Sequence, residues 1–230
     1  MQPQFQMTGQ ATQEVSLQQN KVLRNTYMLL ALSMIPTVAG ALLGVQLKFS
    51  LFPGSPMISF LVFMGIAFAF MWGIERTKES AMGVALLLGF TFFMGLMLAG
   101  ILRVALGFSN GGSLIATAAG GTGAIFFTLA GIATVTKKDF SFLSKFLFIG
   151  LVVVLLASVA NIFFQIPALS LTVSAVAVMI FSGYILYDIS QIVHGGETNY
   201  ISATLRVYLD VYNIFVHLLN LLMMLGGRRD

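Results

Sequence analysis

Two acidic residues lie inside long apolar segments of this 230-residue chain. Asp188 stands in the stretch GYILYDISQIV, and Asp210 lies in the next apolar stretch, within LRVYLDVYNIF. An ionisable side chain in a membrane-spanning segment costs roughly 2.5–3.5 kcal/mol on insertion scales, so it is a functional-site candidate by default. Two carboxylates held close together in a low-dielectric medium cannot both ionise cheaply, and the pair would respond to pH as a unit. With water and carbonyl oxygens they would also suit Ca²⁺, which takes about six to eight oxygen ligands.

A polar stripe runs along the segment that contains Asp210. Its members follow one another at spacings of four, three, four and three residues, which places them on one face of a helix. Lipid would not accept such a face, so it must be buried in protein or line water. The helix that carries it is therefore predicted to be central in the fold. The stripe consists of Arg206, Asp210, Asn213, His217 and Asn220.

A simpler interpretation stays open for the same residues. Arg206 lies one turn before Asp210 and could pair with it inside the membrane, while Asp188 is solvated near the interface. His217 is expected to be a hydrogen-bonded packing residue. No enzyme is expected, because the chain has two histidines and no cysteine, whereas catalytic zinc needs about three protein ligands. The GxSxG motif of serine hydrolases is also absent.

Composition indicates what must position these residues. The chain is 58% hydrophobic and 9% charged, against roughly 25% charged residues in soluble domains. A spanning helix needs about 20 apolar residues, and seven stretches qualify. The predicted fold class is therefore an all-α integral membrane protein with seven transmembrane helices. The predicted spans are 22–47, 57–74, 81–105, 114–135, 143–164, 169–192 and 201–225.

The basic residues indicate an orientation. They stand singly at the ends of apolar runs, which is typical of topology determinants and argues against a nucleic-acid partner. Their bias, roughly seven to four, predicts a multi-pass inner-membrane protein with a cytoplasmic N-terminus and a periplasmic C-terminus. The predicted cytoplasmic side has Lys21, Arg24, Arg76, Lys78, Lys137, Lys138 and Lys145, and the other has Lys48, Arg103, Arg228 and Arg229.

Three further features concern the ends and the packing of the spans. Residues 1–20 are rich in glutamine, carry one charge and lack a signal-peptide pattern, so we expect a disordered cytoplasmic tail before a membrane domain of residues 21–230. Pro36 is expected to kink the first span. The small residues of AAGGTGA, around Gly120, Gly121 and Gly123, indicate close helix packing rather than a phosphate-binding loop.

Several of these stretches resemble the Bax inhibitor family, also called the TMBIM or lifeguard family, and its proteobacterial YccA branch in particular. The resemblance rests mainly on the C-terminal stretch GYILYDISQIVHGGETNYISATLRVYLDVYNIFVHLLNLL. Further matching pieces are KVLRNTYMLL, TKKDFSFL and ANIFFQIPALSL, so it covers nearly the whole chain from Lys21 onward.

The resemblance implies six helices around a central seventh and a paired-aspartate site that maps onto Asp188 and Asp210. In such relatives the pair is linked to pH-dependent Ca²⁺ leak, and an arginine of the second helix serves as a latch. The nearest candidate here is Arg76, beyond the apolar end of the second span. The Gly-Pro of many members' third span is absent, because this chain has Ala99 and Gly100 there.

The YccA branch implies another activity. Its members resemble substrates and modulators of the membrane-anchored ATP-dependent protease FtsH, which engages them through a disordered N-terminal tail. Two hypotheses follow for this chain. In the first it modulates FtsH, alone or with its associated regulators, and is degraded slowly from the tail. In the second it is a pH-gated Ca²⁺ leak through Asp188 and Asp210. Beyond lipid and the transient Ca²⁺ or protons of the second hypothesis, no cofactor is expected.

Overall fold

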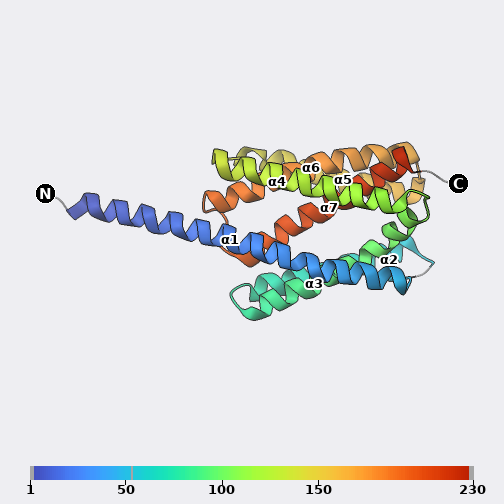
Figure 1. Cartoon of the computed structure of the whole chain (residues 1–230), viewed down its shortest axis with the longest axis horizontal. Coiled ribbons are helices and arrows are strands. Elements are labelled where there is room, and N and C mark those ends of the chain that lie inside the picture. Colours follow the sequence, from blue (N-terminus) through green and yellow to red (C-terminus); the bar gives the residue numbers. More distant parts are fainter. Residues whose placement is uncertain (1–2, 53, 228–230) are drawn as a thin grey trace.

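The fold is a bundle of long helices, seen in a computed structural model that describes residues 3–52 and 54–227 (Figure 1). Arg228 and Arg229 of the charge count, and the first two residues of the predicted tail, lie outside the described residues. A short 3₁₀ helix, η1 (Ser141–Leu143), precedes α5. The long helices are α1 (Pro3–Gln46), α2 (Pro56–Thr77), α3 (Ala81–Leu106), α4 (Gly111–Thr136), α5 (Ser144–Phe164), α6 (Pro167–Val193) and α7 (Tyr200–Gly226).

All seven helices are long and apolar enough to cross a membrane, which confirms the predicted fold class. The helix ends agree with the predicted spans to within a few residues, except at the start of α1. Local chemistry explains several of them. Pro56 and Pro167 open α2 and α6, where a missing N–H costs nothing. The side-chain oxygen of Asn199 caps α7 by accepting hydrogen bonds from the backbone N–H groups of Ile201 and Ser202.

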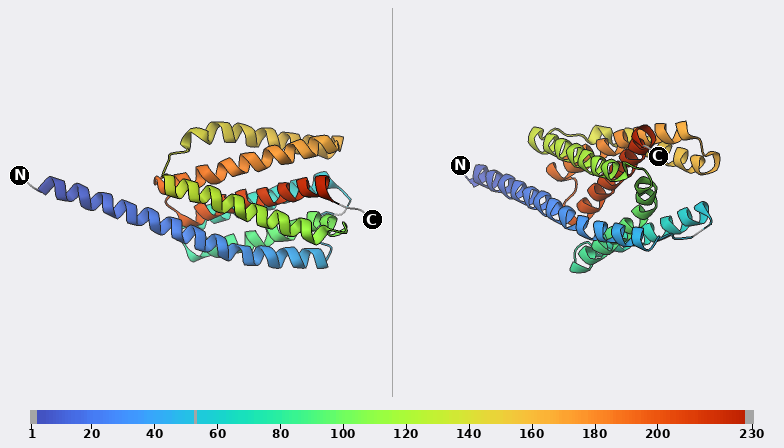
Figure 2. Two further views of the ribbon diagram at one scale, coloured as in Figure 1. Left: turned by 45° about the horizontal axis from the view of Figure 1, so that its top comes forward. Right: turned by 45° about the vertical axis from the view of Figure 1, so that its right-hand side comes forward.

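Helix α7 is central, as its polar stripe predicts. It packs against α1, α2, α3, α4 and α6, while α5 packs against α6 (Figure 2). Polar side chains join α7 to its neighbours. The Tyr208 hydroxyl lies 2.9 Å from the Thr37 hydroxyl of α1, and the Tyr212 hydroxyl donates to the carbonyl oxygen of Met94 in α3. These bonds satisfy the tyrosine hydroxyls at membrane depth, where no bulk water can do so.

The start of α1 differs from the prediction of a tail without structure. Residues 3–20 continue the helix of the first span, so residue 20 marks no boundary in the backbone. Glutamine, alanine, leucine and methionine are good helix formers, and they dominate this part of the chain. The helix then passes through Pro36 without ending. Its first part projects beyond the other helices (Figure 1).

Helices α1 and α3 approach so closely that their backbones touch. A Cβ atom at Gly95 would collide with the carbonyl oxygen of Thr37, and one at Gly40 would collide with that of Phe92. Small residues permit such contacts, which drive helix association in lipid. In the AAGGTGA stretch of α4, the glycines differ in how closely they are packed. A Cβ at Gly121 would lie 2.9 Å from the Leu218 side chain of α7, whereas Gly120 and Gly123 face open space.

Replacing Gly95 by alanine should therefore destabilise the bundle. Overpacking typically costs about 1–3 kcal/mol, more than the roughly 1 kcal/mol that alanine gains over glycine in helix propensity. Thermal unfolding in detergent micelles would measure the effect. Gly100→Ala is the matched control in the same helix, because nothing lies within 4 Å of a Cβ there. Equal melting temperatures for the two variants would contradict the close α1–α3 contact.

Candidate functional site

Asp188 of α6 and Asp210 of α7 lie together in the interior of the bundle. Their exposed fractions are 7% and 5%. The two carboxyl groups are close enough to interact directly, and a hydrogen bond between two carboxyl groups requires one of them to carry a proton. Oδ2 of Asp210 is buried and accepts no hydrogen bond from a donor group among the described residues. The two acidic residues therefore form one shared site.

Arg206 does not neutralise Asp210, the alternative that the sequence left open. Its guanidinium lies 3.0 Å from Oε2 of Glu197, in the turn between α6 and α7. The Arg206 side chain is 48% exposed, whereas the Glu197 side chain is 11% exposed. The arginine thus points toward the end of the bundle, and the buried aspartates have each other as partners.

The remainder of the polar stripe faces α6 toward the opposite end. Nδ1 of His217 lies 3.3 Å from the Ser174 hydroxyl, and the His217 ring stacks on Phe181. The amide of Asn220 donates to the hydroxyls of Ser170 and Ser174, at 3.1 and 2.8 Å. The Asn213 amide donates to the carbonyl oxygen of Leu209, one turn earlier. The contacts of His217 and Asn220 hold α6 against α7, as polar side chains do between membrane helices, whereas the Asn213 bond lies within α7.

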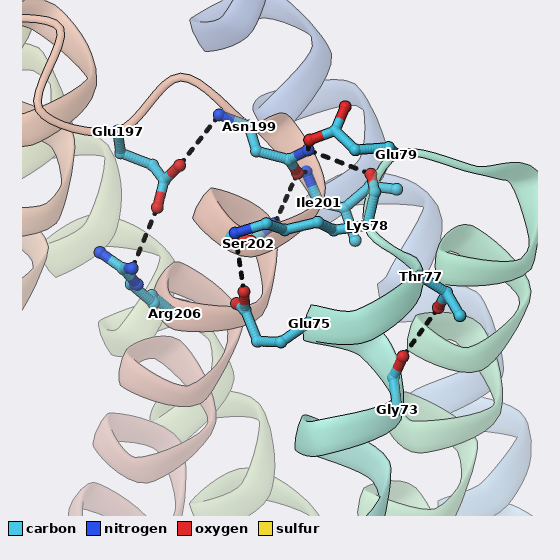
Figure 3. Close-up of polar contacts among 10 residues, drawn as sticks. All are labelled: Gly73, Glu75, Thr77, Lys78, Glu79, Glu197, Asn199, Ile201, Ser202 and Arg206. Atoms are coloured by element: carbon cyan, nitrogen blue, oxygen red, sulfur yellow. Dashed lines mark hydrogen bonds and ion pairs between the residues drawn. The ribbon is translucent and has the colours of Figure 1, made fainter.

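A polar network joins the α2–α3 turn to the start of α7 (Figure 3). Lys78 Nζ lies 3.0 Å from Oε2 of Glu75, and this contact raises the pKa of the lysine. The Asn199 amide donates to the Lys78 carbonyl oxygen at 3.0 Å and to Oε1 of Glu79 at 2.9 Å. The network fixes the end of α2 against the start of α7.

The same network continues to Arg206 through Glu197. One carboxylate oxygen of Glu197 accepts a hydrogen bond from the Asn199 backbone N–H, and the other pairs with Arg206 (Figure 3). Sequence reasoning missed Glu75, Glu197 and Asn199 as partners. The stretches ERTKE and HGGETN lie between the predicted spans, and each contains polar side chains that join the two turns.

Arg76 lies away from the acidic pair. Its guanidinium carbon lies 4.9 Å from the centre of the Trp72 ring, one turn earlier on α2, and the side chain is exposed. This is a cation–π contact at the end of the helix. Neither arginine considered as a partner of the acidic pair contacts it. Arg206 pairs with Glu197, and Arg76 lies on the Trp72 ring.

The oxygen atoms available at the acidic pair determine whether it can bind a metal ion. Among the described residues, no group of three or more histidine, cysteine or acidic side chains is placed to hold a metal ion. Two carboxyl groups could take part in Ca²⁺ passage only with further oxygens from water or backbone carbonyls. On its own, the pair offers two buried carboxyl groups, from adjacent helices, that are close enough to interact.

Seven apolar helices with a buried acidic pair on the last two define a class: multi-pass α-helical membrane proteins with an intramembrane carboxyl site. Comparison with known proteins gives the family. Residues 19–228 match the family model described as "Inhibitor of apoptosis-promoting Bax1". The chain belongs to the Bax inhibitor family.

Individual relatives cover almost the whole chain. The Escherichia coli K12 protein named "Modulator of FtsH protease YccA" is 43% identical over 206 residues, which are 90% of this chain and 91% of the relative. An uncharacterised protein of Neisseria meningitidis serogroup A is 39% identical over 92% of this chain and 94% of its own. An uncharacterised membrane protein of Vibrio cholerae is 38% identical over 96% of both chains. The similarity to the YccA branch is confirmed.

If the two carboxyl groups share a proton, the contact between them predicts how Asp210 tolerates substitution. In Asp210→Asn the amide can donate to Asp188 in place of the protonated carboxyl group, so the melting temperature in detergent should stay close to that of the unchanged chain. Asp210→Ala removes the partner of a buried carboxyl group and should cost about 1–3 kcal/mol of stability. If the asparagine variant is destabilised as much as the alanine variant, the shared hydrogen bond is not what stabilises the pair.

Proposed function

We propose that this protein is a non-catalytic modulator, and slow substrate, of an FtsH-type ATP-dependent protease in the bacterial inner membrane. The observation that carries the proposal is the 43% identity to a protein named as a modulator of that protease, over 90% of the chain. The protein would lie in the lipid bilayer beside the protease, with its N-terminus in the cytoplasm.

The first part of α1 supplies a physical route to this activity. It projects beyond the other helices, so tertiary packing does not stabilise it (Figure 1). Isolated helices of this length are marginally stable in water, and such segments unfold locally at little cost. A protease that pulls on an unfolded end could start there. It would then meet a bundle held by the α1–α3 backbone contacts and the α7 hydrogen bonds. Slow degradation would occupy the protease and so modulate it.

The acidic pair supports a second candidate function, a pH-sensitive Ca²⁺ leak. The specific observation is the contact of Asp188 and Asp210, together with the unpartnered Oδ2 of Asp210. A cation that approached the pair would displace the shared proton, because a proton and a cation compete for the same carboxylate oxygens. Ion passage would then depend on pH. The two functions do not exclude each other, because they use different parts of the chain.

Shortening the chain tests the first function. With purified FtsH in proteoliposomes, a chain that begins at Lys21 should be degraded at least tenfold more slowly, and should no longer slow the degradation of a second membrane substrate. Replacing residues 3–16 by a Gly/Ser segment of equal length is the matched control. It should restore both effects if the protease needs an unfolded end rather than a particular sequence. Unchanged degradation of the shortened chain would remove the role assigned to the start of α1.

Ca²⁺ flux into liposomes between pH 6 and pH 8 tests the second function. The unchanged chain should show a pH-dependent flux, and the Asp188→Asn/Asp210→Asn variant should lose the pH dependence, because neither amide titrates. Asn220→Ala is the control variant, because it alters the same helix without changing a titratable group. No flux from well-folded unchanged protein would exclude the leak and leave the pair a structural role.

A further inference from the structure

A long groove runs between α1 and α4. It has a volume of about 1330 Å³, larger than the roughly 300–1,000 Å³ of ordinary ligand pockets. Its floor is α7, which is visible between α1 and α4 in Figure 1, and α3 contributes to one end. The walls are formed by side chains such as Val38 and Leu42 of α1 and Phe127 of α4, and the floor includes Val211 and Phe215.

The groove is as long as the hydrocarbon layer is thick. On α1 its lining extends from Tyr27 to Gln46, about 29 Å at roughly 1.5 Å per residue, against about 30 Å for a bilayer core. Glycines keep it open on the α4 side, since a Cβ at Gly123 or Gly131 would meet nothing within 4 Å. Its rim is exposed and apolar, with Phe127 74% exposed. Lipid acyl chains are the medium that surrounds such a rim.

Basic side chains gather at one end of the groove. The Tyr27 hydroxyl of α1 lies 3.3 Å from the Thr134 hydroxyl of α4. This contact places Tyr27 and Thr134 side by side at this end of the groove. Arg24 is one turn before Tyr27, and Lys137 and Lys138 directly follow the last turn of α4. All three basic side chains are exposed.

The backbone that carries the two lysines is held in place. Nε2 of His194 donates to the Lys137 carbonyl oxygen at 3.0 Å, and the Ser190 hydroxyl donates to that of Lys138 at 3.3 Å. The pKa of the neighbouring acid, Asp139, is lowered by hydrogen bonding from the side chain and the backbone N–H of Ser141. One carboxylate against three cations leaves this end of the groove positively charged.

We propose that the groove binds an anionic phospholipid, with its acyl chains along α1, α4 and α7 and its phosphate at Arg24, Lys137 and Lys138. Basic residues beside transmembrane helices bind anionic headgroups in this way. A transmembrane helix of a partner protein is the competing occupant. The observations favour lipid, because three exposed basic side chains lie at this end. At the other end, Lys48 is exposed, while Arg103 is half-buried and donates to the carbonyl oxygens of Ala99 and Phe49. A helix about 10–12 Å wide would also have to pass the Tyr27–Thr134 contact, which narrows the end near Arg24.

Native mass spectrometry of the full chain in detergent tests this proposal, with phosphatidylglycerol and phosphatidylcholine as probes. Phosphatidylglycerol should bind at least tenfold more tightly. The variant Arg24→Gln/Lys137→Gln/Lys138→Gln should lose that preference, since each basic residue near a headgroup contributes about fivefold. Lys145→Gln is the matched control, because Lys145 is exposed on the same side of the bundle but lies on α5, away from the groove.

A second variant tests the groove itself rather than the charges. Gly123→Leu places a side chain in open space within the groove and should weaken phosphatidylglycerol binding without lowering the melting temperature in lipid-free detergent. Equal binding of the two lipids by the unchanged chain would overturn the proposal. So would unchanged phosphatidylglycerol binding in the groove variant. Loss of FtsH binding in Gly123→Leu with lipid binding unchanged would assign the groove to a partner helix instead.

Discussion

The rest of the structure depends on one constraint: polar groups at membrane depth must find their partners within the protein. Helix α7 has many such groups, and helices α1, α3 and α6 provide hydrogen-bond partners for them. The carboxyl group of Asp210 meets Asp188, and the amide of Asn220 meets two serines of α6. On other faces of the helix, Tyr208 and Tyr212 meet α1 and α3. A helix with polar side chains on several faces can be stable in lipid only at the centre of a bundle.

The acidic pair is the point at which this requirement is met least completely. Oδ2 of Asp210 is buried and accepts no hydrogen bond from a donor group among the described residues. An unpartnered buried oxygen costs about 1–3 kcal/mol. A bundle that needed only stability would gain from an apolar residue there. Arg206, the nearest cation on the same helix, pairs with Glu197 at the end of the bundle instead.

Sequence patterns predicted the features that depend on one segment at a time. Hydropathy and turn residues located the seven helices, and helical spacing placed Asp210, His217 and Asn220 on one face. Partners distant in sequence were beyond the reach of such patterns. A pair of Arg206 with Asp210 was left open because the two residues are one turn apart, whereas the structure pairs Arg206 with Glu197, in the turn before α7.

The groove and the start of α1 were missed for related reasons. Gly120, Gly121 and Gly123 were all expected to pack, but only Gly121 has a close neighbour, because the others lie on faces of α4 that α7 does not cover. A cavity depends on how far apart two helices are set, and one sequence carries little information about that. The start of α1 has the residues of a good helix former, although its polarity suggested a tail without structure.

The proposed lipid would connect features that the two candidate functions treat separately. Arg24 lies two residues after Val22, a core residue of α1, so a phosphate bound at Arg24 would lie near the projecting part of the helix. At the floor of the groove, Val211 and Tyr212 adjoin Asp210 on the next positions of α7. An acyl chain in the groove and the acidic pair would thus press on different faces of the same helix. Because α7 packs against five other helices, it can shift little without disturbing both. Membrane composition, the accessibility of the N-terminal segment and the geometry of the acidic pair would then be linked through one central helix.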